Sequence, residues 1–220
     1  MKLNTNSNAY IIAYSCAMVV IVAFLLAFVS SVLKERQDVN VALDKKKQIL
    51  AALNIRDLGD ADAEAKYGEV VLDTENNKQA FLLNSADYKA ENYKVYECQV
   101  DGEKKYVVPV YGMGLWGAIW GYVAVNADGN TVYGAYFNHD SETAGLGAEI
   151  KDSKAWQDKF AGKKIYGADG SAALKVVKSS ELKNPESEVD GITGATLTSN
   201  GVSDMLQDGF KKYKTLLSHE

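Results

Sequence analysis

The longest uncharged stretch of the chain lies near its start. Ala9 to Leu33 is almost entirely apolar and contains no charged side chain. As a helix, this stretch spans about 37 Å at 1.5 Å per residue, which exceeds a hydrocarbon core of about 30 Å. The apolar region of a secretory signal is shorter, roughly 7–15 residues. The pattern therefore predicts an N-terminal tail over residues 1–8 and an uncleaved transmembrane helix over residues 9–33.

A helical pattern continues beyond this span. Apolar residues recur at roughly helical spacing, among them Val39, Leu43 and Ile49, with charged residues between them. The run Lys45–Lys47 fits a solvated face of such a helix. The pattern breaks near residues 54–59, so we expect a helical connector over residues 34–54 and a folded domain over residues 55–220.

Two pairs of strands are predicted in the middle of the chain. Each pair flanks an Asp-Gly dipeptide, which is typical of a hairpin turn. The expected strands are Tyr93–Val100 with Tyr106–Tyr111, and Trp120–Asn126 with Thr131–Asn138. Ala172–Val177 is predicted as a further strand.

Helices are predicted after the hairpins. Trp156 and Phe160 indicate a short helix after Glu149. Ser199 to Leu217 predicts an amphipathic terminal helix, because its apolar residues recur at intervals of three and four; they are Val202, Met205, Leu206, Phe210 and Tyr213. Hairpins followed by helices indicate an α+β fold: a single N-terminal transmembrane helix followed by an antiparallel-sheet domain.

Composition narrows the possible functions. The chain is 47% apolar and 24% charged with a net charge of −5, which argues against global disorder and against a nucleic-acid-binding protein. Its cysteines, Cys16 and Cys98, are far apart, and its histidines are His139 and His219. These residues supply neither a metal site nor a disulfide framework. Redox chemistry would therefore need an organic cofactor or partner chains.

One glycine motif looks like a dinucleotide site and is interpreted otherwise. Gly112 to Gly117 matches GxGxxG, but that fingerprint requires a helix to begin within it. Here the next segment, residues 118–126, has the pattern of a strand. These glycines are instead expected to allow a tight turn, or a close approach of the backbone to a ligand or another strand. Trp116 and Trp120 are interpreted first as core residues.

The segment from Asp190 to Val202 is the best candidate for a functional site. Small residues at positions 191, 194 and 195 leave Thr196 unshielded, and a helix that begins near Ser199 would direct its free N–H groups at this loop. Such a helix terminus suits a phosphate, which Thr196 could hold by a hydrogen bond or an ester. The alternative is a plain loop in which Thr198 or Ser199 caps the helix.

Two motifs in this chain resemble those of a known family. Asp190-x-x-Thr193-Gly194-Ala195-Thr196 resembles the Dxx(S/T)GAT flavinylation motif of FMN-binding domains. Residues 142–147, Glu-Thr-Ala-Gly-Leu-Gly, resemble the family's ETPGLG loop, with Ala144 where proline is usual, so the turn lacks proline's rigidity. Together with the single anchor, the lysine-rich helix and the run over residues 196–202, nearly the whole chain resembles the C subunits of the sodium-translocating NADH:quinone oxidoreductases.

This resemblance implies a cofactor and its site. FMN would be joined through its phosphate to Thr196 by a flavin transferase that uses FAD and magnesium, with Asp190 serving recognition by that enzyme. The residues expected to contact the flavin are Thr193, Gly194, Ala195 and Thr196 of the motif, Glu142, Thr143, Gly145, Leu146 and Gly147 of the loop, and Trp116. Glu142 could instead be a helix cap or a surface charge.

The resemblance also implies a setting. The chain would pass electrons between other subunits of a membrane complex that reduces quinone and pumps sodium, with no catalytic residue and no metal ligand of its own. Its main domain would lie in the periplasm, anchored in the bacterial inner membrane. The positive charges after residue 33 favour the cytoplasm instead, because Lys and Arg gather on that side. The alternatives are the G subunit of the related NAD:ferredoxin oxidoreductase complex and a flavin-free, membrane-tethered binding or assembly domain.

Overall fold

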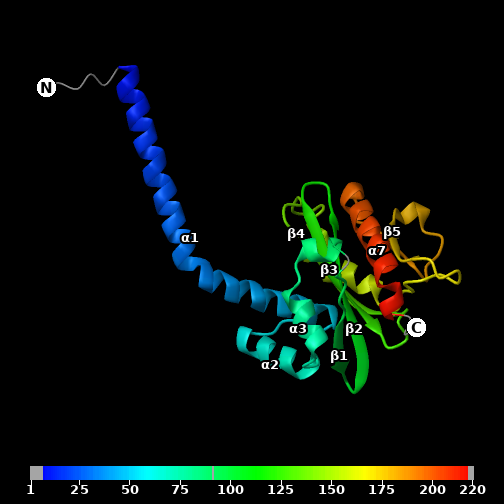
Figure 1. The fold of residues 1–220 in the computed structure, drawn as a ribbon. Coiled ribbons are helices and arrows are strands. Elements are labelled where there is room, and N and C mark those ends of the chain that lie inside the picture. Colours follow the sequence, from blue (N-terminus) through cyan, green and yellow to red (C-terminus); the bar gives the residue numbers. More distant parts are fainter. Residues whose placement is uncertain (1–6, 91, 218–220) are drawn as a thin grey trace. The chain divides into compact units, whose positions relative to one another are not determined.

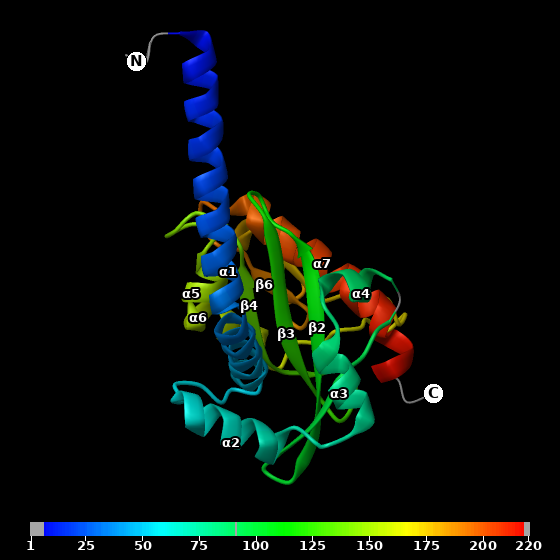
Figure 2. The ribbon, with the colours of Figure 1, turned by 60° about the vertical axis from the view of Figure 1, so that its left-hand side comes forward.

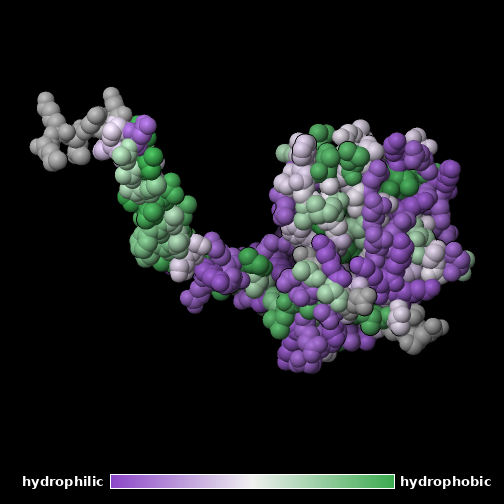
Figure 3. Space-filling model, turned by 45° about the horizontal axis from the view of Figure 1, so that its top comes forward, coloured by the Kyte–Doolittle hydropathy of each residue, from purple (hydrophilic) through white to green (hydrophobic). Residues whose placement is uncertain are grey.

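The computed structural model describes residues 7–90 and 92–217, and divides the chain into two units at Asp44 and Lys45. His219 and residues 1–6 of the predicted tail lie outside the described residues. The first unit is the N-terminal part of helix α1 (Asn8–Ala52). The apolar side chains between Ile11 and Leu33 are exposed, and Figure 3 shows the apolar surface along this part of the helix. Within the described ranges, α1 is the one helix long and apolar enough to cross a membrane.

Helix α1 runs without interruption through the predicted connector to Ala52. Its last turns belong to the second unit, where Gln48, Ile49 and Leu50 become buried. The indole N–H of Trp120 donates to Gln48 Oε1 at 2.9 Å. The end of α1 is therefore packed against the sheet.

A four-stranded antiparallel sheet forms the centre of the second unit (Figure 1). Its strands are in the order β1 (Tyr96–Val100), β2 (Glu103–Met113), β3 (Ala118–Asn126) and β4 (Val132–His139). Both predicted hairpins are confirmed. The first turns through Asp101 and Gly102, which have positive φ angles of 52° and 80°. Such a turn matches the twist of the two strands.

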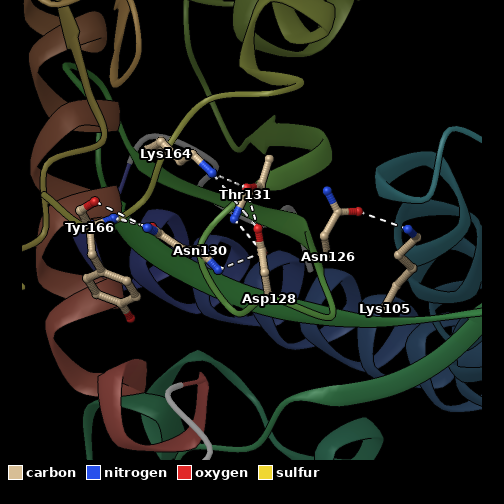
Figure 4. Close-up of polar contacts among 7 residues, drawn as sticks. All are labelled: Lys105, Asn126, Asp128, Asn130, Thr131, Lys164 and Tyr166. Carbon is tan, nitrogen blue, oxygen red and sulfur yellow. Dashed lines mark hydrogen bonds and ion pairs between the residues drawn. The ribbon is translucent and has the colours of Figure 1, made fainter. Parts of the chain in front are cut away.

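The second hairpin turn is held by side chains (Figure 4). Asp128 accepts the backbone N–H of Asn130 at 3.0 Å and of Thr131 at 2.8 Å. Lys164 donates to Thr131 Oγ1 at 2.6 Å, and the Tyr166 N–H donates to Asn130 Oδ1 at 2.7 Å. The turn is thus tied to a segment more than thirty residues later, which pins the β3–β4 register.

Both faces of the sheet are covered, as Figure 2 shows. Helix α7 (Thr196–Leu217) packs on one face through its predicted apolar stripe, which joins Val108, Val110 and Val123 in the core. The end of α1 lies over the other face, with α2 (Asp60–Val70) and α3 (Glu75–Leu82) against β1. Burial from two sides explains why β3 is buried from Tyr122 to Val125 without alternation.

Several elements differ from the expected pattern. Helices α2, α3 and α4 (Ser85–Lys89) were not predicted, since they are short and bury few residues. Short helices occur near Trp156 as expected: α5 (Glu149–Asp152), α6 (Lys154–Gln157) and η1 (Asp158–Phe160). The strand predicted from Ala172 is wrong in its first half. Only β5 (Lys175–Val177) is a strand, and it pairs in parallel with the unpredicted β6 (Glu188–Asp190).

Candidate functional site

Thr196 is the first residue of α7, and it is exposed. The connection from β6, residues 191–195, turns through Gly194, whose φ of 82° is rare for residues with a side chain. The Ala195 N–H closes the turn by donating to the Ile192 carbonyl at 3.1 Å. The motif therefore presents the Thr196 hydroxyl at a helix N-terminus, three residues earlier than the periodicity predicts.

The two residues considered as helix caps have other partners. Both Thr198 and Ser199 lie inside α7 and are buried. Ser199 Oγ accepts the Ile192 N–H at 3.1 Å, which folds the motif back onto the helix. The Thr198 hydroxyl donates to Glu142 Oε2 at 2.5 Å. The N-cap interpretation of these two residues is therefore wrong.

Glu142 joins three separate segments of the chain. Its side chain is buried, and Oε1 accepts the Trp116 N–H at 2.8 Å while Oε2 accepts from Thr198. Its own N–H donates to His139 Nδ1 at 3.2 Å. The carboxylate thereby ties the β2–β3 turn and the start of α7 to the loop that follows β4. Both of its oxygens have protein partners, and contact with a flavin stays a prediction.

The loop resembling ETPGLG folds into a compact turn without its proline. The N–H groups of Leu146 and Ala148 both donate to the Thr143 carbonyl, at 3.1 and 3.0 Å. A Cβ added at Gly194 would come within 3.0 Å of Leu146 Cδ2. The loop therefore lies directly against the Thr196 motif.

The GxGxxG segment begins in the last two residues of β2, and its last four residues form the turn of the β2–β3 hairpin. The Gly114 N–H donates to the Gly117 carbonyl at 2.8 Å, and β3 begins at the next residue. The expected strand in place of a helix is thus confirmed, and the dinucleotide interpretation stays rejected. A Cβ on Gly201 of α7 would come within 2.3 Å of the Met113 carbonyl, so the helix and the turn approach as closely as glycine permits.

Exposed apolar side chains stand on the three segments that Glu142 joins. The core interpretation of Trp116 is wrong, because its side chain is 66% exposed; Trp120 is partly buried against Gln48. Leu146 is 41% exposed. Three further exposed apolar residues on these segments were not predicted from the sequence, namely Met113, Leu115 and Leu197. A leucine directly after Thr196, on the polar side of an amphipathic helix, was the available signal for Leu197.

A pocket of about 220 Å³ opens beside Thr196. It is smaller than the roughly 300–1,000 Å³ that usually encloses a whole cofactor, so it suits a phosphate and not a flavin ring. Lys178 is the one ionisable residue in its lining, which consists of Val177, Lys178, Ser179, Gly191, Ile192, Thr193, Gly194, Thr196, Ser199 and Asn200. Sequence analysis missed Lys178, because only strand pairing brings it to the motif.

The first residue of the motif is held on two sides. Asp190 Oδ2 pairs with Lys159 Nζ at 2.9 Å, and its carbonyl accepts the Trp156 indole N–H at 2.8 Å. Both charged side chains are partly exposed. Asp190, where the motif begins, is therefore held in place beside the buried aromatic side chain of Trp156. Among the residues that the structure describes, no group of three His, Cys, Asp or Glu side chains is placed to hold a metal ion.

Comparison with known proteins places these features in a family. Residues 114–211 match the FMN-binding domain family. The chain is 31% identical to the C subunit of the Na(+)-translocating NADH-quinone reductase of Vibrio anguillarum, over 92% of this chain and 90% of that protein. It is 32% identical to the corresponding C subunit of Haemophilus ducreyi, over 95% of this chain and 92% of that protein.

Solved structures agree with these relatives. The crystal structure of the Na(+)-translocating NADH-quinone reductase C subunit from Parabacteroides distasonis superposes with a TM-score of 0.78 at 37% identity, over 86% of this chain and 98% of that chain. NqrC from Shewanella oneidensis, at 23% identity, shares the fold with a TM-score of 0.66, over 80% of this chain and 97% of that chain.

Proposed function

The chain belongs to the family of C subunits of the Na(+)-translocating NADH-quinone reductases, and we propose that it carries FMN joined covalently through its phosphate to Thr196. The observation that carries this proposal is the exposed Thr196 hydroxyl, which stands at the start of α7 beside a phosphate-sized pocket. Mass spectrometry of the peptide containing Thr196 tests it directly. An unmodified peptide from cells that express the flavin transferase would contradict it.

The residues around Thr196 fit the phosphate end of FMN. The first N–H groups of a helix have no carbonyl one turn earlier and attract an anion, and the positive end of the helix dipole adds to this. Thr193, Ser199 and Asn200 line the pocket with polar groups, and Lys178 adds a positive charge. Among the lining residues there is no carboxylate to repel the phosphate.

Attachment is a phosphoryl-transfer reaction. The Thr196 oxygen would bond to the phosphorus on the FMN side of FAD, and its proton would be released to solvent. The bond from that phosphorus to the bridging oxygen of the pyrophosphate would break, and AMP would leave with the bridging oxygen. The exposure of Thr196 lets a separate flavin transferase reach the hydroxyl, and the accessible Asp190 carboxylate offers that enzyme a recognition point.

The flavin ring has apolar surface available next to its tether. Trp116, Leu146 and Leu197 are exposed large side chains on the three segments that Glu142 joins, one of which is the start of α7. We propose that Trp116 and Leu146 pack against the ring, and that Thr143, Gly145 and Gly147 shape the loop that faces it. Glu142 supports this surface by holding the Trp116 N–H and the Thr198 hydroxyl.

The chain acts as an electron carrier within a larger complex. FMN, when bound, supplies the capacity to accept and release electrons; the protein supplies its position and electrostatic surroundings. The glycine-rich segment that resembles a dinucleotide site is a hairpin turn, so NADH is proposed to bind another subunit. The proposed partners are the other subunits of the reductase and, during maturation, the flavin transferase.

The N-terminal unit attaches the protein to a membrane through α1. We propose that residues 9–33 span the inner membrane, with residues 1–8 as a tail, residues 34–54 as a connector and residues 55–220 as a periplasmic FMN-binding domain. The resemblance to the family supports the periplasm, while the positive charges after residue 33 favour the cytoplasm. Labelling of an introduced surface cysteine with an impermeant thiol reagent decides between them. Labelling only after the inner membrane is opened would refute the periplasmic placement.

A further inference from the structure

A lysine lies beside the motif because of the parallel pairing between β5 and β6. In this register Val177 is opposite Asp190, and the Gly191 N–H donates to the Val177 carbonyl at 2.7 Å. Lys178 follows Val177 directly, so the chain leaves β5 next to the residues that lead to Thr196. No sequence spacing indicates this neighbourhood, since Lys178 and Thr196 belong to different elements.

Lys178 has the chemistry of an anion partner. Among the residues lining the pocket beside Thr196, it is the one that carries a charge, and the other lining residues are hydroxyl, amide and glycine residues with two apolar ones, Val177 and Ile192. Its ion pair with Glu181 is long, at 3.7 Å, and both side chains are largely exposed, 59% and 61%. Exposed pairs of this kind contribute little, so the ammonium group is free to exchange Glu181 for a better anion.

The backbone that carries Lys178 is held in place. The Val176 N–H donates to Ser203 Oγ on α7 at 3.3 Å. On the neighbouring strand, the Glu188 carboxylate accepts the N–H groups of Lys183 and Asn184, at 2.6 and 2.8 Å, and pairs with Lys175 at 3.2 Å. β5, β6 and the first half of α7 are thereby joined, which keeps the start of the Lys178 side chain at a constant place relative to Thr196.

We propose that Lys178 is the cationic partner of the flavin phosphate, binding the pyrophosphate of the incoming flavin donor during transfer and the phosphodiester on Thr196 afterwards. This inference rests on the proposed attachment of FMN to Thr196. A phosphodiester keeps one negative charge after the bond forms. The α7 N-terminus and the Lys178 ammonium group would meet that charge from two sides of the pocket.

The test measures flavin incorporation into the full-length chain in detergent, with purified flavin transferase, FAD and magnesium. Lys178→Met should incorporate flavin more slowly than wild type at low ionic strength, by roughly two- to fivefold, and Lys178→Arg should stay close to wild type. The difference should vanish at high ionic strength, because salt screens a charge effect at an exposed site. Lys183→Met is the matched control, since Lys183 lies in the same β5–β6 connection and outside the pocket lining.

A second measurement compares the thermal stability of the chains before and after flavin attachment. Flavin attachment should raise the thermal midpoint of wild type more than that of Lys178→Met, while the unmodified chains should melt alike. Equal incorporation by wild type and Lys178→Met at low salt would overturn the inference and leave Thr196 as the acceptor. A deficit that salt does not change would also overturn it, because it would indicate a structural defect. Wild-type protein without flavin on Thr196 would overturn the proposed function as well.

Discussion

Glu142 and Thr198, 56 positions apart in the chain, share a buried hydrogen bond of 2.5 Å between the carboxylate Oε2 and the threonine hydroxyl. Because the other carboxylate oxygen holds the Trp116 N–H, this bond links the loop after β4 to both the β2–β3 turn and α7. The relative positions of these three segments therefore depend on one buried carboxylate.

Thr198→Val and Glu142→Ala test this link. Glu142→Ala should lower the free energy of unfolding by about 2–3 kcal/mol, since it removes the partner of the buried Thr198 hydroxyl and of the part-buried Trp116 N–H. Thr198→Val should cost about 1–2 kcal/mol. The double variant should be less destabilised than the sum, with a coupling of roughly 0.5–3 kcal/mol measured by denaturant unfolding. Simple additivity would mean that the two residues do not depend on each other.

Thr196→Ala should give a folded protein without covalent flavin. The side chain is exposed, so the free energy of unfolding should change by less than about 0.5 kcal/mol. Denatured, washed protein should be colourless, with no flavin mass on the peptide. Thr193→Ala is the matched control, because it removes an exposed hydroxyl from the same motif and pocket but leaves the proposed acceptor in place; covalent flavin should still form, even if more slowly. Covalent flavin on the Thr196→Ala chain would exclude Thr196 as the acceptor.

The complex that contains Thr196→Ala should keep one activity of the reductase and lose another. NADH oxidation with a soluble artificial acceptor should continue, because NADH is proposed to bind another subunit. Quinol formation should fail, because the chain of carriers is broken at this subunit. Assembly should survive, since the substitution leaves α1 untouched. Quinol production at the wild-type rate would mean that the flavin on this subunit is not an obligatory carrier.

Two glycine substitutions should change the free energy of unfolding in opposite directions. Gly201→Ala would place a Cβ 2.3 Å from the Met113 carbonyl, so α7 and the β2–β3 turn must separate, and we expect a loss of about 1–3 kcal/mol. Gly68→Ala, inside α2, meets nothing within 4 Å and should stabilise the protein by roughly 0.5–1 kcal/mol. Thermal unfolding of both variants checks this. If Gly201→Ala were as stable as wild type, the packing between Gly201 and the Met113 carbonyl would not be tight.

The Glu188 carboxyl should make the free energy of unfolding depend on pH. Backbone N–H groups of Asn184 and Lys183 lower the pKa of its carboxyl to about 2, with Lys175 contributing. A depressed carboxyl pKa adds stability above the unfolded value of about 4.3, and this stability is lost as the pH falls through the folded value. Glu188→Gln should therefore be less stable than wild type at neutral pH, and the two unfolding curves should converge near pH 2. A constant difference across that range would exclude this charge effect.

Local patterns in the sequence were sufficient for much of this protein. An uncharged stretch predicts a membrane helix, Asp-Gly dipeptides between alternating segments predict both hairpins, and an apolar stripe predicts α7, because each depends on neighbours within a few residues. Thr196 could be proposed as the flavin acceptor for the same reason, since its motif is contiguous.

Tertiary structure alone decided which distant residues surround that threonine. Lys178 reaches the pocket through the parallel pairing of β5 with β6, and Glu142 meets Thr198 only after β4 and α7 have packed. Trp116 is a large apolar residue of the kind usually found in a core, yet it lies in a four-residue turn and its side chain is exposed. Such contacts depend on strand register and helix packing across the whole domain, and no spacing between neighbouring residues encodes them.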